Sequence, residues 1–219
     1  MCEKETIRGS IAEKCSRMAN EYDSKKEGWL GPEVVFGMMY EFVKQGQLLL
    51  DIGIGTGLSS ILFHKAGLHI YGMDLSKEML DACKNKGFAE DLKVHDLTVT
   101  PYPYADEMFD HVVCIGVLNH FEDLKPVFNE ATRLLKNDGL FAIVIGDRKE
   151  NEEPQFQVQH EGATYTMYRY SAEVINKLLE ENNFKNIREL EFFVYGQQEK
   201  DQPIRLRAYI ARRQKKNEK

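Results

Sequence analysis

The chain has 219 residues, a length that suits one α/β domain and allows a hydrophobic core. Its formal net charge of -6 argues against binding of nucleic acid through the overall charge of the protein, but it is compatible with a local basic patch. No apolar run reaches the roughly 20 residues of a membrane-spanning helix, and the first residues are polar and acidic. We therefore expect a soluble, cytoplasmic protein with no membrane partner.

The cysteines and histidines show no metal-binding spacing. The four cysteines are scattered without a C-x-x-C pair, and the six histidines include no H-E-x-x-H pattern. We expect reduced, mostly structural thiols and no metal site.

Short apolar runs alternate with amphipathic stretches from residue 48 to residue 145, which is typical of βαβ units around a parallel sheet. The expected strands are 48–52, 68–73, 91–95, 110–116 and 140–145. The expected helices are 57–66, 76–86 and 123–136, the second capped by Ser76 and the third ended by Asn137-Asp138-Gly139.

The pattern changes after residue 147. Alternating residues at 156–160 and 163–168 around Glu161-Gly162 predict a β-hairpin inside an insertion at 147–170. A helix at 171–182 and two antiparallel strands at 187–195 and 204–212 follow. With an N-terminal helical segment or lid at 1–45 and a flexible tail at 212–219, we expect a single domain, because no linker divides the chain.

The strongest motif is Asp51-Ile-Gly53-Ile-Gly55-Thr-Gly57, which follows the buried strand 48–52 directly. Glycines permit positive φ angles and let a ligand approach the backbone. At the carboxyl end of the first strand, such a loop lies where doubly wound sheets bind ligands.

The details of this loop favour S-adenosylmethionine (SAM) over a dinucleotide. The dinucleotide fingerprint is G-x-G-x-x-G, but the position of its third glycine is occupied here by Leu58. Asp51 would repel a pyrophosphate, whereas it would attract the ammonium group of SAM.

Two further acids follow the next strands. Asp74 ends the second strand, 23 residues after Asp51, where an acid can accept hydrogen bonds from ribose hydroxyls. Asp96 follows the third strand and is placed to accept from an adenine amino group.

Together these motifs resemble the class I SAM-dependent methyltransferases over residues 22–184. The glycine loop resembles the first motif of that family, Gly72-Met-Asp74-Leu-Ser-Lys-Glu-Met79 the second, and Val94-His-Asp96-Leu97 the adenine-binding segment. The resemblance implies an α/β, doubly wound, mostly parallel seven-stranded sheet of order 3-2-1-4-5-7-6 with an antiparallel last strand, flanked by helices. It implies that SAM, with S-adenosylhomocysteine (SAH) as product, is bound by Tyr22, Asp51, Gly53, Ile54, Gly55, Gly57, Asp74, Leu75, Met79, Asp96, Leu97 and Ile115.

The residues that contact the methyl acceptor are less well defined by the sequence. Methyl transfer from a sulfonium needs alignment and exclusion of water, and a general base if the acceptor carries a proton. His120, after the fourth strand, is the candidate base, and the acceptor site is assigned to Tyr165, Tyr168, Arg169 and Tyr195.

The acceptor is expected to be a small molecule. The turn after the fourth strand, Gly116-Val-Leu-Asn-His120, differs from the Asn-Pro-Pro-Tyr type of adenine-amine and glutamine-amide methylases. A tRNA or protein methyltransferase, a non-catalytic SAM-binding subunit and an NAD-dependent oxidoreductase are the alternatives. The protein is expected to be a monomer or a homodimer.

Overall fold

The computed structural model describes residues 19, 21–25, 28–160, 163–195 and 203–215, and its centre is a seven-stranded sheet of order β3-β2-β1-β4-β5-β9-β8. The strands are β1 (Leu48–Ile52), β2 (His69–Asp74), β3 (Ala89–Val94), β4 (Phe109–Ile115), β5 (Leu135–Gly146), β8 (Phe184–Val194) and β9 (Ile204–Arg213). β1 to β5 are parallel, and β9 runs antiparallel to both of its neighbours. Numbered along the chain, these seven strands have the order 3-2-1-4-5-7-6, which confirms the predicted architecture.

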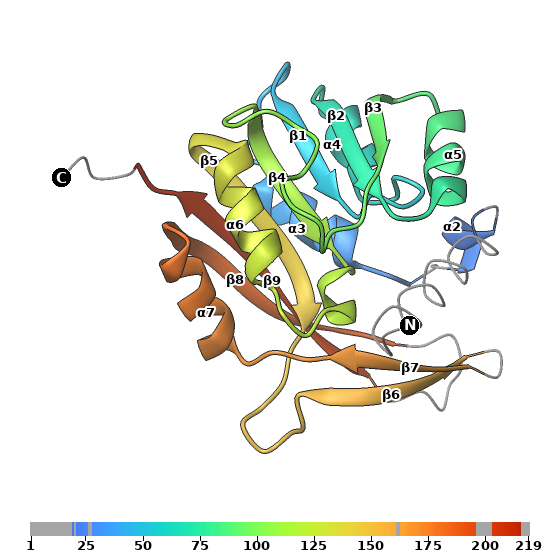
Figure 1. Ribbon diagram of the computed structural model, residues 1–219, viewed down its shortest axis with the longest axis vertical. Coiled ribbons are helices and arrows are strands. Elements are labelled where there is room, and N and C mark those ends of the chain that lie inside the picture. Colours follow the sequence, from blue (N-terminus) through green and yellow to red (C-terminus); the bar gives the residue numbers. More distant parts are fainter. Residues whose placement is uncertain (1–18, 20, 26–27, 161–162, 196–202, 216–219) are drawn as a thin grey trace.

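Helices cover both faces of the sheet (Figure 1). On one face lie α3 (Gly31–Met39), α4 (Ser60–Lys65) and α5 (Lys77–Asn85), and on the other lie α6 (Lys125–Leu134) and α7 (Ala172–Glu181). Leu49 faces the first group, whereas Leu50 and Ile52 face the second. Because β1 is buried on both sides, its sequence is apolar on both faces except for the buried Asp51 and does not alternate.

The hairpin formed by β6 (Gln155–His160) and β7 (Ala163–Tyr168) is separate from the main sheet. It lies at the carboxyl end of the parallel strands (Figure 1), where β7 contacts the short 3-10 helix η1 (Leu118–His120). A bridge between Asp147 and Tyr170 ties both ends of the insertion to the end of β5. The predicted hairpin is confirmed, although its turn, Glu161-Gly162, lies outside the described residues.

Two predicted helix boundaries are wrong for local reasons. α4 begins at Ser60 and not at residue 57, because Gly57 has a φ of 83° and belongs to the turn. α6 ends at Leu134, and Leu135 already pairs with Phe109 as the first residue of β5. The predicted turn at residues 137–139 therefore falls inside β5, where the register with β4 shifts.

The two ends of the chain are described in part. In the N-terminal segment, α2 (Tyr22–Lys25) and α3 are helical, while residues 1–18, 20, 26 and 27 lie outside the described residues. β9 extends to Arg213, which is 7% exposed and bonded to Glu107, so the predicted tail begins two residues too early.

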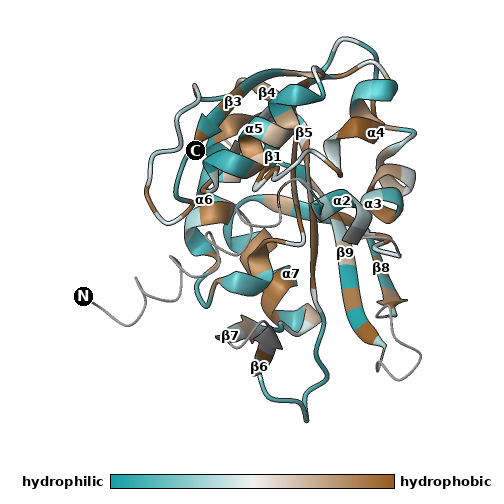
Figure 2. Cartoon of the chain, turned by 90° about the vertical axis from the view of Figure 1, so that its right-hand side faces the viewer, coloured by the Kyte–Doolittle hydropathy of each residue, from teal (hydrophilic) through white to brown (hydrophobic). Residues whose placement is uncertain are grey.

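The start of β9 carries apolar and basic residues in alternation, which Figure 2 shows as brown and teal bands. Within the described part of the chain, no helix is both long and apolar enough to cross a membrane.

Candidate functional site

A cavity opens around the loop after β1, between the ends of β2, β3 and β4. Gly53 and Gly55 line it with φ angles of 75° and 54°, a conformation that side chains with a Cβ rarely adopt. A Cβ on Gly53 would come within 2.5 Å of the Val117 side chain. The glycine is therefore needed both for the turn and for the close approach of the residues after β4.

Asp74, at the end of β2, connects the glycine loop to the start of α5. Its Oδ2 accepts a hydrogen bond from the Gly55 N–H and its Oδ1 accepts one from the Ser76 N–H, each at 2.9 Å. Ser76 in turn caps α5 by accepting from the Met79 N–H at 3.2 Å, which places Met79 in the cavity wall. Burial raises the pKa of Asp74, and the backbone donors oppose this shift. Asp74 also lines the cavity, where its carboxylate can accept a hydrogen bond from a ligand hydroxyl.

Asp96 and Leu97 line the same side of the cavity from the loop after β3. The Asp96 Oδ1 accepts from the N–H and the hydroxyl of Thr98, whereas its Oδ2 has no hydrogen-bond partner among the described residues. The Tyr102 hydroxyl donates to the Leu97 carbonyl oxygen at 2.8 Å and so fixes the backbone of this segment.

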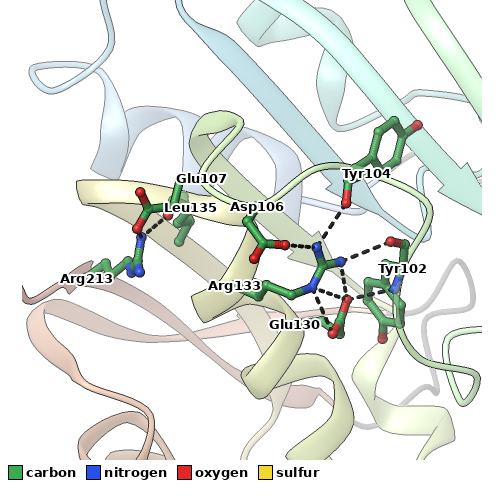
Figure 3. Close-up of polar contacts among 8 residues, drawn as sticks. All are labelled: Tyr102, Tyr104, Asp106, Glu107, Glu130, Arg133, Leu135 and Arg213. Carbon is green, nitrogen blue, oxygen red and sulfur yellow. Dashed lines mark hydrogen bonds and ion pairs between the residues drawn. The ribbon is translucent and has the colours of Figure 1, made fainter. Parts of the chain in front are cut away.

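Two charged residues of α6 support that loop (Figure 3). The Arg133 guanidinium donates to the carbonyl oxygens of Tyr102 and Tyr104, both at 2.9 Å. It also pairs with Glu130, whose Oε2 accepts from the Tyr102 N–H at 2.7 Å. The β3–β4 loop is thus fixed by a partly buried ion pair whose two residues do not line the cavity.

Asp51 lies beneath the loop and does not line the cavity. It is 1% exposed, and its Oδ2 accepts a hydrogen bond from the Ser60 hydroxyl at 2.6 Å. Burial raises the pKa of Asp51 to about 7; the Ser60 bond lowers it and nearby Asp74 raises it further.

The β4 side of the cavity is formed by Ile115, Gly116, Val117, His120 and Phe121. This turn is held from the end of β5 and from the insertion. The Gly146 N–H donates to Asn119 Oδ1 at 2.9 Å, and the Tyr170 hydroxyl donates to the Phe121 carbonyl oxygen. His120 therefore has a fixed backbone at the rim of the cavity.

Tyr22 and Trp29 cover the cavity from the N-terminal side. Asp23, next to Tyr22, accepts a hydrogen bond from the Thr56 hydroxyl at 2.6 Å and forms an ion pair with Lys86. These contacts attach α2 to the glycine loop and to the end of α5.

Most of the predicted cofactor residues meet in this cavity. Those that line it are Tyr22, Gly53, Ile54, Gly55, Asp74, Leu75, Met79, Asp96, Leu97 and Ile115, together with the candidate base His120. Asp51 and Gly57 do not line it. A Cβ on Gly57 would come within 2.5 Å of Phe88 and 2.8 Å of Cys83 Sγ, so packing against α5 requires this glycine.

The structure does not bring the predicted acceptor residues Tyr165, Tyr168, Arg169 and Tyr195 to the cavity. Tyr165 is 8% exposed, and the Arg169 guanidinium lies over the Phe156 ring within the hairpin. Tyr195 is 70% exposed at the end of β8. The alternation of these residues predicts strands, but it does not show which face of the hairpin meets the rest of the protein.

The sequence reasoning missed Trp29, Val117 and Phe121. Trp29 is the only tryptophan of the chain and stands two residues before Gly31, a signal that could have identified it. Among the described residues, no cluster of three or more histidine, cysteine or acidic side chains could hold a metal ion.

Comparisons with known proteins agree with this geometry. The sequence model of a family described as "Methyltransferase domain" matches residues 50–143. The chain is 32% identical over 110 residues to an uncharacterized methyltransferase, YcgJ, of Bacillus subtilis, covering 48% of this chain and 42% of that protein. It is 31% identical over 105 residues to a ubiquinone biosynthesis O-methyltransferase of Haemophilus ducreyi, covering 45% and 44%. The aligned part of the chain thus spans less than half the length of either relative.

A solved structure shares the whole fold. It is the 1,6-didemethyltoxoflavin-N1-methyltransferase of Burkholderia thailandensis, solved with bound 1,6-didemethyltoxoflavin and SAH. The TM-score is 0.69 at 14% identity, with 98% of this chain and 92% of that chain covered.

Proposed function

We propose that the chain is a class I SAM-dependent methyltransferase that transfers a methyl group from SAM to a small-molecule acceptor, because a methyltransferase domain matches residues 50–143 and the sheet has the class I strand order. The observation that carries this proposal is the anchored Asp74, which holds the glycine loop and lines a cavity together with most of the residues that the family resemblance assigns to SAM.

The charges of the cavity fit SAM. Among the described lining residues the only charged side chains are Asp74 and Asp96, and none is lysine or arginine. SAM carries a sulfonium and an ammonium group, which these carboxylates attract, whereas the pyrophosphate of NAD would meet acidic groups without a basic partner. Leu58, which replaces the third glycine of a dinucleotide loop, lies in the cavity wall.

Each residue of the site is assigned a role in binding SAM or in methyl transfer. Asp74 is assigned to the ribose hydroxyls, Asp96 to the adenine amino group and Met79 to the adenine face, while the buried Asp51 lies under the loop and is bonded to Ser60. His120 is assigned as the base that accepts the acceptor's proton. SAM would supply an activated methyl group: the acceptor lone pair would bond to the methyl carbon while the carbon–sulfur bond breaks and its electron pair goes to sulfur. His120 would take the proton that the acceptor loses.

The shape and charge of the site and the names of two similar proteins support a small acceptor. The site is a cavity and not a basic surface, and the chain is acidic overall. Two of the similar proteins are named for ubiquinone biosynthesis and for didemethyltoxoflavin, both of which are small molecules.

The test is calorimetric titration of the purified protein with SAH, with NAD titrated in parallel. We expect saturable one-to-one binding of SAH and no heat from NAD. Binding of NAD without binding of SAH would contradict the proposal. When SAH binds, methyl transfer from labelled SAM to candidate acceptors then separates an enzyme from a non-catalytic subunit.

A further inference from the structure

The cavity has two chemically different sides. In the sheet order β3-β2-β1-β4, residues after β2 and β3 lie on one side of the glycine loop and residues after β4 on the other. Asp74 and Asp96, the only charged lining side chains in the described part of the chain, both belong to the β2–β3 side. The β4 side carries Trp29, Val117, Phe121 and His120.

The indole of Trp29 is held in place by two glycines. A Cβ on Gly31 would come within 2.5 Å of the Trp29 Cζ2 atom, and a Cβ on Gly116 within 3.1 Å of the same atom. The ring therefore packs directly against the backbone at both positions. It forms a fixed, flat wall of the cavity and not a side chain that adapts to any ligand.

Val117 and Phe121 are similarly fixed. Val117 packs against the backbone of Gly53, and the Tyr170 hydroxyl holds the carbonyl of Phe121. The β4 side is thus a rigid, largely aromatic surface beside the imidazole of His120.

We propose, on the basis of the proposed function, that the acceptor is a planar aromatic molecule that is uncharged when it binds and offers a hydroxyl or ring N–H for methylation. A flat ring gains contact with fixed aromatic walls that a saturated ring of the same size cannot match. A cationic amine or an anionic carboxylate would lose its hydration on the β4 side without meeting an opposite charge among the described residues that line it. Histidine exchanges protons near neutral pH, so His120 suits an acceptor whose proton must leave.

The test is a matched series of ligands titrated into the SAH-saturated protein by calorimetry. The series is naphthol, its saturated analogue decahydronaphthol, the anion naphthoate and the cation naphthylmethylammonium. We expect naphthol to bind at least about tenfold more tightly than each of the other three. Equal or tighter binding of the saturated or of either charged compound would overturn the inference.

Variants of the protein locate the binding to the β4 side. Phe121→Leu should weaken naphthol binding about tenfold and leave the affinity for SAH within about twofold, because only the acceptor wall changes. Phe193→Leu is the control, since Phe193 is exposed on β8 and does not line the cavity. Unchanged naphthol binding in Phe121→Leu would contradict the assignment of this wall. Absence of SAH binding by the wild type would instead contradict the proposed function itself.

Discussion

At the scale of single residues, Asp74 connects the glycine loop to the start of α5. One carboxylate holds Gly55 of the glycine loop and Ser76 at the start of α5, and the same residue lines the cavity. Its position follows from sequence: an acid at the end of the second strand is a local feature that needs no knowledge of packing.

Replacing Asp74 tests this role. Asp74→Ala should weaken SAH binding about ten- to a hundredfold, because hydrogen bonds to a charged group contribute about 1.5–3 kcal/mol. Asp81→Ala is the matched control: Asp81 is an exposed residue of α5 whose ion-pair partner among the described residues is Lys77, at the surface. Calorimetry with SAH gives both affinities, and equal values for the two variants would remove Asp74 from the ligand site.

Other residues of the site could not be predicted individually. Trp29 reaches the cavity because the segment before α3 packs across the end of β4, a contact between parts of the chain nearly 90 residues apart (Trp29 and Gly116). Gly57 was assigned to the ligand by its motif, but the structure shows that α5 packing requires it. Motif spacing thus identifies the loop, whereas the three-dimensional packing decides which of its members face the ligand.

At the scale of elements, α6 supports the β3–β4 loop that carries Asp96 and Leu97. Arg133 and Glu130 hold the backbone of Tyr102, and the Tyr102 hydroxyl holds Leu97 (Figure 3). The sequence predicts this helix from its apolar positions, but its polar residues gave no sign that they support the loop.

Removing the Arg133 guanidinium should therefore destabilise the fold. Arg133→Met should lower the free energy of unfolding by about 2–4 kcal/mol, because it leaves two carbonyl oxygens and the buried Glu130 without their partner. Lys77→Ala, which breaks an exposed pair, should change it by less than about 1 kcal/mol. Urea denaturation measures both, and similar midpoints would show that the Arg133 contacts contribute little.

The strand order was predictable because alternating strands and helices restrict the topology strongly. The boundaries that failed are those where a positive φ or a β pairing with a distant strand ends a helix, as at Gly57 and Leu135. Neither cause is visible in the local pattern of apolar residues.

At the scale of the whole molecule, two buried groups couple folding to pH with opposite signs. Burial lowers the pKa of His111 from 6.5 to about 4 and raises that of Asp51 from 3.8 to about 7. Between about pH 4 and 6.5 the unfolded chain binds one more proton at His111, so His111 makes stability fall as the pH falls. In the same range the folded protein binds one more proton at Asp51, so Asp51 makes stability fall as the pH rises. The two effects offset each other, and the wild type should show a nearly flat profile from these groups.

Single substitutions should reveal the pH dependence of stability that each of the two groups causes. Asp51→Asn should lose about 3 kcal/mol of unfolding free energy relative to the wild-type profile as the pH falls from 6.5 to 4, because the effect of His111 is then no longer offset by Asp51. His111→Gln should lose about 4 kcal/mol as the pH rises from 4 to 7. Urea denaturation across this pH range tests both, and parallel profiles for the two variants would contradict the opposite signs.

The most direct test of the central claim is a crystal structure of the protein with SAH. The account predicts the ribose hydroxyls at Asp74, the adenine beside Asp96 and the sulfur atom directed toward Trp29 and His120 on the β4 side. SAH bound outside this cavity, or with its sulfur directed toward β3, would contradict the assignment of the site and of its acceptor side.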